Sequence, residues 1–565
     1  MDTRENLIKI NHVGFLCNAP KRFVFTGESK TCEFTVEYLK DTLYTEAYRG
    51  KLEYMATEDD KGYVGDFSSL QAEGDYRISV DGIKSRHFVI YDKAYDNLAR
   101  VLLSYFTYQR CGSELGWAGK CHMDDGYIAE TGKHVDLSGG YHQSCDLRKS
   151  PAGVIQGVLG MARYALSRKP HWGEILITDE LKWASDYYLK VIQENGAEYN
   201  TLNAPLGWDG RVFYESAAPD SAQWCTTSFL ALCSIYFAKR DKERSQKCLE
   251  TAKRSFEYMT GKNRRQTMYR HPGEFPMGMD PDNFYEPCFP NSGADYGYMA
   301  VVAADMYVAT NDKSYLKYVA DGADGLCSME IHNGLIKIWK DKEASVTSRC
   351  CYSWIMGLYE GLCCAIEFLP DAKNVNKWKE ALKSYCDLIC GLAKKSVWNR
   401  IPSIYTDEDL DFRSGHLYVW MTHLPSIAEK LAPFSRYNNL NYKFRKFLTL
   451  PAIDMFSAMI LKRAQKIFNS DIYGKLAQTA LDIVLGCNKL DASHVNAIGY
   501  NQISQCPFGQ FFPPTPHIPG AINIGFEDAD STTYSEYDMP CVGMCMYLIS
   551  ELEKSGADKF LVEIN

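Results

Sequence analysis

The residue types best suited to chemistry gather in one short stretch, VDLSGGYHQSCDLRK, which runs from Val135 to Lys149. Two glycines, a histidine, a glutamine, a cysteine and an aspartate lie there within a few residues, with almost no apolar periodicity. A buried strand or helix needs apolar side chains at a regular period, so this stretch predicts a functional loop. A second Cys-His pair, Cys121 and His122, stands just upstream and raises the question of a bound metal.

The bulk composition narrows the classes of protein to which the chain can belong. Its 565 residues predict two domains, or one large helical domain with an accessory module. With a formal net charge of -9 and no basic block, the chain is not expected to bind nucleic acid or an anionic membrane. An acidic chain with 38 Tyr, 26 Phe and 10 Trp is compatible with a neutral substrate such as a sugar.

Three sequence features predict a cytoplasmic protein. No window reaches the ~20 apolar residues of a membrane span, and the opening MDTRENLIKINHVGF lacks the apolar core of a secretory signal. The 20 cysteines are scattered through apolar runs without the spacing of a disulfide framework, as expected of reduced core thiols. A signal removed from the chain is the alternative that stays open.

Two kinds of secondary structure divide the chain at about residue 93. Before it, short runs rich in β-branched and aromatic residues are separated by turn residues, which predicts a small β-sandwich. Its expected strands include residues 22–27, 32–39, 75–82 and 86–92. After it, the apolar period is helical nearly to the end. We therefore assign residues 1–93 to the β-sandwich and residues 94–565 to a helical domain.

About a dozen helices are expected in the helical domain, many with one broad apolar face. The clearest candidates are residues 97–109, 151–167, 179–195, 221–239, 245–261, 294–310, 351–369, 376–395, 452–468, 473–486 and 538–555. No short repeat is visible, so a regular solenoid is not expected. A toroid of paired helices with long loops gathered at one end fits this pattern better.

Five motifs, in order along essentially the whole chain, resemble glycoside hydrolase family 9, in the subgroup with an N-terminal immunoglobulin-like domain. They are IKINHVGFLCNAPKRFVF near the start, YFTYQRCGSEL at the beginning of the helical domain, VDLSGGYHQSCDLRK, LAQTALDIVLGCNKLDASHVNAIGYN, and PHIPGAINIGFEDADSTTYSEYD before the last helix. The resemblance implies a mainly α fold, an (α/α)6 barrel preceded by a small immunoglobulin-like β-sandwich. It also implies an enzyme that hydrolyses β-glycosidic bonds with inversion.

The resemblance further implies a structural zinc ion near the entrance of the barrel. The matching ligand positions are Cys111, Cys121, His122 and His142. A Cys2His2 set suits tetrahedral Zn2+ with every position filled by protein, and the ion would staple a stretch that is poor in apolar residues. The alternative is that these residues are unrelated core thiols and hydrogen-bonded histidines.

The resemblance assigns the catalytic base to Asp146 and, as the best match, the acid to Glu536. An inverting glycosidase needs one carboxylic acid to protonate the leaving oxygen and one carboxylate to activate water on the opposite face, about 6.5–9.5 Å away. The plainer alternatives are that Asp146 bonds loop amides or caps the following helix, and that Glu536 stabilises a helix N-terminus.

The chain departs from the family pattern in three places. Gln143 replaces the first signature aspartate, which helps to hold the water, so Gln143 can accept a hydrogen bond from water but Asp146 would be the only base. The segment QISQCPFGQFFPPTP replaces a His-His-Arg sugar-binding element. An ungapped match of the last motif would put Thr532 rather than Glu536 at the acid position.

Several aromatic and polar residues are candidates for contact with the sugar. Tyr141 stands where the family signature has a tryptophan, and Trp208 and Trp224 are candidate stacking platforms on loop edges. Arg413 and His416, in DFRSGHLYVW, are the nearest match to a polar clamp. For each aromatic residue the competing interpretation is packing in the core.

The combined prediction is a zinc-stabilised glycosidase whose partner is a soluble β-linked oligosaccharide of the β-glucan or cello-oligosaccharide type. A β-glucosaminide or another hexoside, cleaved in an exo manner, is the alternative substrate because the sugar contacts have changed. A first rival is a non-hydrolytic sugar-binding protein that kept the barrel. A second is another (α/α)6 enzyme, such as a polysaccharide lyase or an epimerase.

Overall fold

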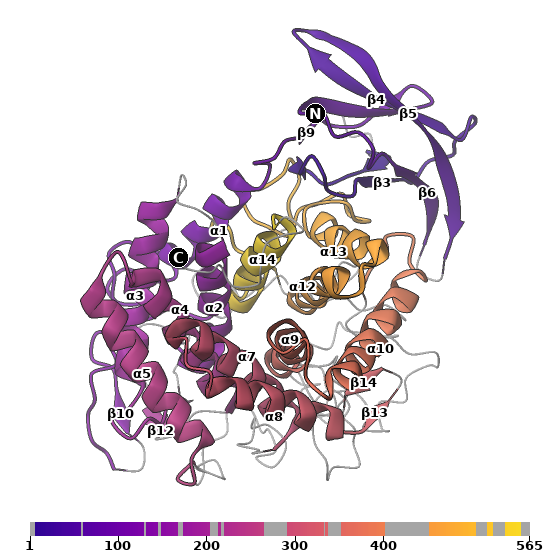
Figure 1. Cartoon of the computed structure of the whole chain (residues 1–565). Coiled ribbons are helices and arrows are strands. Elements are labelled where there is room, and N and C mark those ends of the chain that lie inside the picture. The colour runs from indigo at the N-terminus through magenta and orange to yellow at the C-terminus, as the bar shows by residue number, and fades with distance from the viewer. Residues whose placement is uncertain are drawn as a thin grey trace, which may run out of the picture.

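The computed structural model describes residues 6–57, 60–128, 131–144, 149–167, 173–203, 213–215, 220–264, 291–332, 334–336, 352–401, 451–503, 517–523 and 537–554. In these residues a part made of strands leads into a ring of helices (Figure 1). The predicted fold class, a β-sandwich followed by an (α/α)6 barrel, is confirmed.

The strands of the N-terminal part are hydrogen-bonded in the order β1-β3-β6-β5-β4-β7-β9-β2, with β8 paired to β7. They are β1 (Ile8–Lys9), β2 (Gly14–Phe15), β3 (Arg22–Phe25), β4 (Glu33–Lys40), β5 (Leu43–Ala56), β6 (Lys61–Asp66), β7 (Gly74–Val80), β8 (Ile83–Lys84) and β9 (Phe88–Ile90). The long strand β5 joins the two layers, because its first part pairs with β4 and its last five residues pair with β6. Phe23, Phe34 and Ile78, from β3, β4 and β7, meet in one apolar core between the layers.

Six helices form a closed inner ring, in which each contacts the next and the last packs against the first (Figure 1). They are α2 (Pro151–Ser167), α4 (Asp220–Phe237), α7 (Gly293–Thr310), α9 (Tyr352–Phe368), α12 (Pro451–Phe468) and α14 (Met539–Leu552). The outer helices are α1 (Asp96–Tyr108), α3 (Glu174–Val191), α5 (Lys242–Thr260), α8 (Tyr315–Ser328), α10 (Val375–Ala393) and α13 (Asp471–Val484). Outer and inner helices alternate along the chain, so the inner helices share one direction and begin at the same end of the ring.

Short strands accompany the ring and form two small sheets. They are β10 (Tyr127–Ile128), β11 (Asn200–Asn203), β12 (Phe213–Glu215), β13 (Ile331–His332) and β14 (Leu335–Ile336). No described helix is long and apolar enough to cross a membrane.

A buried polar network crosses the centre of the ring and takes one side chain from every inner helix. Its members are Arg163 of α2, Ser228 of α4, Asp305 of α7, Glu360 of α9, Arg463 of α12 and Tyr547 of α14. Arg163 donates two hydrogen bonds to Asp305, at 2.6 and 2.7 Å, and Tyr547 donates one to Glu360 at 2.5 Å. Arg463 lies 3.5 Å from the same Glu360 oxygen. Arg463 also donates to Glu367 of α9 at 2.8 Å, so two guanidinium groups face three carboxylates and each buried charge has a partner.

The ring closes through a seam of glycines between α2 and α14. A Cβ atom on Gly160 would lie 2.1 Å from the carbonyl oxygen of Gly543, and one on Gly543 would lie 2.3 Å from that of Gly157. The two backbones therefore touch, and any side chain at these positions would push the helices apart. This close approach brings together the chain segments that precede α2 and α14.

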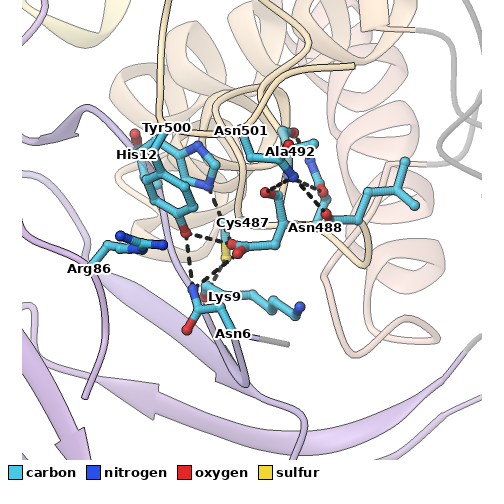
Figure 2. A network of polar contacts seen from close by, with 12 residues as sticks. Asn6, Lys9, His12, Arg86, Cys487, Asn488, Ala492, Tyr500 and Asn501 are labelled. Carbon is cyan, nitrogen blue, oxygen red and sulfur yellow. Dashed lines mark hydrogen bonds and ion pairs between the residues drawn. The ribbon is translucent and has the colours of Figure 1, made fainter. Parts of the chain in front are cut away.

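The β-sandwich docks on the ring through a polar cluster around His12 (Figure 2). The His12 imidazole stacks on the Tyr500 ring at 3.8 Å, and its Nε2 lies 3.3 Å from Asp491 Oδ1. Asn6 donates at 3.0 Å both to Asp491 and to the Tyr500 hydroxyl. Gly499 has a positive φ of 87°, and a Cβ there would lie 2.6 Å from the His12 ring. The sandwich thereby holds the loop of residues 486–503.

A second contact between the two parts buries Asp482 of α13. Its Oδ1 accepts hydrogen bonds of 2.8 Å from the amides of Asn11 and Gln478, and burial raises the pKa of this carboxyl to about 7. Beside it, Arg22 donates to the carbonyl oxygens of Val397 and Trp398 at 2.7 and 2.9 Å. Residues far apart in the sequence thus share one interface.

We predict that Gly160→Ala destabilises the protein while Gly391→Ala does not. The Gly160 methyl would collide with the backbone of α14, which should lower the free energy of unfolding by about 1–3 kcal/mol. Gly391 of α10 is exposed and has nothing within 4 Å of its Cβ position, so alanine should stabilise by up to ~1 kcal/mol. Urea unfolding of both variants is the measurement. Equal stability of the two variants would contradict the tight seam.

Candidate active site and metal centre

Two consecutive glycines turn the chain into the segment that carries the signature residues. Gly139 and Gly140 have φ values of +93° and +72°, a region that other residues rarely adopt. A Cβ on Gly140 would also lie 2.8 Å from the Tyr187 ring. The Gly-Gly pair of the motif is therefore a backbone requirement of this turn.

After the turn, residues 140–142 pair with residues 109–111 at the end of α1. Arg110 and Tyr141 form an antiparallel bridge, the Cys111 amide donates to Gly140 at 2.9 Å, and the His142 amide donates to Gln109 at 2.9 Å. Because neighbouring residues of a strand point to opposite sides, Cys111 and His142 share the side opposite to Arg110 and Tyr141. The pairing thus brings two predicted ligands together from positions 31 apart in the chain.

All four predicted metal ligands converge in the structure. One ligand atom from each of Cys111, Cys121, His122 and His142 lies within 4.8 Å of all the others, and all four residues are buried. Cys121 Sγ lies 3.3 Å from His142 Nε2. Both ring nitrogens of His122 and Nδ1 of His142 are buried without a hydrogen-bond partner in the described chain. Orphaned imidazole nitrogens beside two thiols are a donor set that fits a metal ion.

The electrostatics of the two cysteines agree with this donor set. Hydrogen bonding from Cys111, and then from the two imidazoles, holds the pKa of the Cys121 thiol far below its ordinary value. Burial raises the pKa of Cys111 well above its ordinary value, and burial lowers that of His142. A divalent cation would stabilise both sulfurs as thiolates.

His142 and Lys149, which lie on either side of position 146 in the sequence, form an antiparallel bridge. Lys149 is fully buried, and its ammonium donates to Asp125 at 3.0 Å and to the Leu137 carbonyl at 2.5 Å. A buried ion pair with a further hydrogen bond fixes the backbone at Lys149. Lys149 belongs to the signature motif, whereas Asp125 belongs to none and was not identified from the sequence.

The segments that lead to the two predicted catalytic residues lie side by side. Ser144 and Asp538 form an antiparallel bridge, and the Met539 amide donates to the Gln143 carbonyl at 3.1 Å. Asp146 and Glu536 themselves lie outside the described residues, as do Trp208, Arg413 and His416. Of the predicted catalytic residues the structure describes Gln143. Its side chain lies against the first turn of α2, where a Cβ on Gly153 would meet its Oε1 at 2.1 Å.

Tyr537 and Asp538, the two residues before α14, are tied back to the loop held by the β-sandwich. Val495 pairs with Ile522, and Asn523 pairs with Tyr537. A continuous set of backbone pairings therefore runs from the loop of residues 486–503 to the segment before α14. The N-terminal domain and the region around Ser144 are mechanically connected.

Two aromatic residues that were candidates for the sugar site have packing contacts in the structure. Tyr141 is 1% exposed, and its hydroxyl donates to Glu180 at 2.8 Å, so its predicted contact with sugar gains no support and stays a prediction. Trp224 is fully buried in α4 and donates to Asp295 at 2.8 Å. Its predicted place on a loop edge is wrong, because α4 is an inner helix.

A buried acid that the sequence analysis did not identify lies between α3 and α4. Glu198 is fully buried beside Thr226 and has no cationic partner among the described residues. Burial raises its pKa to about 8, so the carboxyl is neutral at pH 7. No motif marks this residue, since only the fold shows that a glutamate is enclosed there.

Comparison with known proteins places this geometry in context. Residues 95–520 match the model of "Glycosyl hydrolase family 9", and residues 3–85 match that of "Cellulase N-terminal ig-like domain". The cellodextrinase of Butyrivibrio fibrisolvens is 25% identical over 538 residues, which cover 87% of this chain and 85% of the relative.

Solved structures share the fold. A single mutant of the thermostable endoglucanase from Alicyclobacillus acidocaldarius matches with a TM-score of 0.66 and 16% identity, covering 98% of this chain and all of that chain. A zinc-binding triple mutant of the family 9 endoglucanase J30 matches with a TM-score of 0.65 and 15% identity, covering 95% of this chain and 99% of that chain. At these identities the likeness concerns architecture.

We predict that Glu198→Gln makes stability less dependent on pH. The folded pKa of about 8 exceeds the ordinary 4.5, so the unfolded chain loses this proton first and stability falls as pH rises from 4.5 to 8. That loss is on the order of 3 kcal/mol by pH 7, at about 1.4 kcal/mol per pH unit. The variant should lose this slope in urea unfolding at pH 5, 6.5 and 8. Glu194→Gln, at an exposed position nearby, should keep it. A wild-type slope in both variants would contradict the buried neutral acid.

Proposed function

The chain belongs to glycosyl hydrolase family 9, and from that premise we propose that it hydrolyses β-1,4-linked glucan oligosaccharides with inversion at the anomeric carbon. The observation that carries this proposal is the bridge between Ser144 and Asp538. It sets the segment leading to Asp146 against the segment following Glu536, at the end of the ring where the inner helices begin. The likeness to a cellodextrinase, over 87% of this chain and 85% of the relative, supports short, soluble glucan chains as the substrate.

In this proposal Asp146 is the general base and Glu536 the general acid. Asp146 follows Ser144 by two residues, and Glu536 precedes Asp538 by two. Each residue is thus two positions along the sequence from the bridge, so the bridge supports a shared site for both carboxyl groups. Glu536 would protonate the leaving glycosidic oxygen while Asp146 takes a proton from the attacking water. The required separation of about 6.5–9.5 Å leaves room for that water and the sugar.

Gln143 changes the way in which the water is held. A glutamine can accept a hydrogen bond from water through its carbonyl oxygen, but it cannot share negative charge or take a proton. Its backbone carbonyl is already bonded to Met539, which anchors the residue beside α14. Gln143 therefore acts as an orienting group in this proposal, and Asp146 supplies the charge alone. Trp208, Arg413 and His416 are proposed to contact the sugar.

The same proposal assigns a zinc ion to Cys111, Cys121, His122 and His142. Four buried protein ligands leave no open position, so the ion would be structural and take no part in bond cleavage. It would hold the irregular residues 111–142 in place beneath the catalytic segment. The existence of a zinc-binding form among the family 9 structures is consistent with this assignment.

One observation favours a second candidate, a sugar-binding protein without hydrolytic activity. Gln143 has replaced a carboxylate of the signature, and an ungapped match places Thr532 at the acid position. Binding of cello-oligosaccharides by a wild type that releases no product would establish this alternative.

We predict that Asp146→Asn and Glu536→Gln each lower kcat on cellotetraose by about 10²–10⁴-fold, because each removes a proton-transfer group. Asp136→Asn is the matched control, since this carboxylate of the same motif is exposed and bonds only to Ser138 and Lys190 among the described residues. Initial rates of all three variants, with folding checked by circular dichroism, provide the measurement. An active Glu536→Gln together with an inactive Thr532→Val would move the acid to the alternative position.

We predict one zinc ion per chain by mass spectrometry of metals in the purified protein. Cys121→Ser should lose most of it and unfold at lower temperature, because the buried ligands would lose their cation. Cys32→Ser, at an exposed cysteine of the β-sandwich, should retain the full zinc content. A metal-free wild type that is as stable with a chelator as without it would contradict the assignment.

A further inference from the structure

A single buried carboxylate, Glu180, bonds to Arg110 and Tyr141, one residue from each of the two paired segments that carry the predicted ligands Cys111 and His142. Glu180 lies on the outer helix α3, belongs to none of the sequence motifs, and is 1% exposed. It is neither a predicted ligand nor a predicted catalytic residue. Its position behind the ligand pairing suggests a role in placing that pairing.

Four donor groups from three different side chains converge on Glu180. Thr107 donates to Oε2 at 2.7 Å and Tyr141 donates to Oε1 at 2.8 Å. Arg110 donates through Nε to Oε1 at 3.0 Å and through Nη2 to Oε2 at 2.9 Å. Both carboxylate oxygens are thus used twice, in a bidentate ion pair with additional hydrogen bonds.

Glu180 sits on the opposite side of the paired strands from the metal ligands. Arg110 and Tyr141 are bridge partners, so their side chains point to the same side, where both reach Glu180. Cys111 and His142 are the next residue on each strand and point to the metal side. A slip of one residue between the strands would separate the ligands and would also break the Glu180 contacts.

We propose that Glu180 is a positioning residue, which fixes the register of residues 109–111 against residues 140–142. This register places Cys111 beside His142 and fixes the backbone that leads to Asp146. This inference rests on the proposed function for its catalytic consequence. The part that concerns the metal stands on the geometry of the ligand strands alone.

The charge of Glu180 is essential to this role. An ionised carboxylate offers only acceptor sites, and four donors occupy them here. A glutamine would turn one oxygen into an NH2 group that faces donors, and it would leave the Arg110 guanidinium without its buried anion. The Trp183 indole, which lies 5.0 Å below that guanidinium and donates to Gly140 at 3.0 Å, cannot replace the anion.

The chain offers a matched control in the neighbouring residue. Asp179 also pairs with Arg110, at 2.7 Å through the same Nη2, but its side chain is 62% exposed. An exposed ion pair contributes little, and water can replace it. Asp179→Asn therefore removes a carboxylate from the same arginine without disturbing the buried clamp.

The test compares Glu180→Gln with Asp179→Asn in the full-length protein for zinc affinity, kcat and KM on cellotetraose. We expect Glu180→Gln to weaken zinc binding in a chelator competition by about 10–100-fold. We expect its kcat to fall by about 10-fold or more with KM within about threefold, because the proposed sugar contacts Trp208, Arg413 and His416 belong to other segments of the chain while the catalytic segment is displaced. Asp179→Asn should match the wild type in all three.

If Glu180→Gln does not fold, Tyr141→Phe replaces it in the test. This variant removes one hydrogen-bond donor to Glu180 and keeps the packed aromatic side chain. It should weaken zinc binding by a smaller factor in the same direction. Variants that melt earlier yet keep wild-type zinc affinity and kcat would overturn the proposal, because Glu180 would then only stabilise α3. If the wild type hydrolyses no sugar, the proposed function fails, and the zinc affinity of the same variants still decides the role of Glu180.

Discussion

The buried ion network between Arg163, Asp305, Glu360 and Arg463 is the constraint on which the barrel depends. Charges of this kind are tolerated in a core only when each has its partner, so every inner helix must present its residue at the same height. Ser228 and Tyr547 complete the network from the two helices without a charge in it. An apolar core could accept small rotations of a helix, whereas this network cannot. The ring thereby holds in fixed positions the residues at the end where the inner helices begin.

Close backbone contacts fix the position of the site relative to this ring of helices. The glycine seam of α2 and α14 allows Ser144 and Asp538 to pair, and this pairing is the meeting point of the two segments that are proposed to carry the catalytic residues. Three further supports approach it from different directions. The buried Lys149–Asp125 ion pair fixes the backbone at Lys149. Glu180 binds Arg110 and Tyr141 on the side opposite to the predicted metal ligands. The β-sandwich contacts residues 486–503 through His12. The site is thus assembled from parts of the chain that are hundreds of residues apart.

The sequence predicted the elements whose own residues carry the signal, and it could not predict those defined by their surroundings. The Cys2His2 cluster was predicted because the family resemblance marks its four positions, and the structure brings all four together. Helix α8 was not among the expected helices, since Gly322 and Gly325 weaken its pattern. Both glycines are required by contact with Tyr296 of α7, which only the fold reveals. Glu180 and Glu198 were missed for the same reason, because surface and buried glutamates look alike in a sequence.

The measurement that tests the account most directly is the anomeric form of the first product released from cellotetraose. Proton NMR during the first minutes, before the product equilibrates between its anomers, distinguishes the two stereochemical outcomes. Base and acid carboxylates that flank the bond across a water molecule predict the α-anomer from a β-linked substrate. The β-anomer would contradict the account, since it would mean a covalent intermediate and a closer carboxylate pair of about 5–5.5 Å.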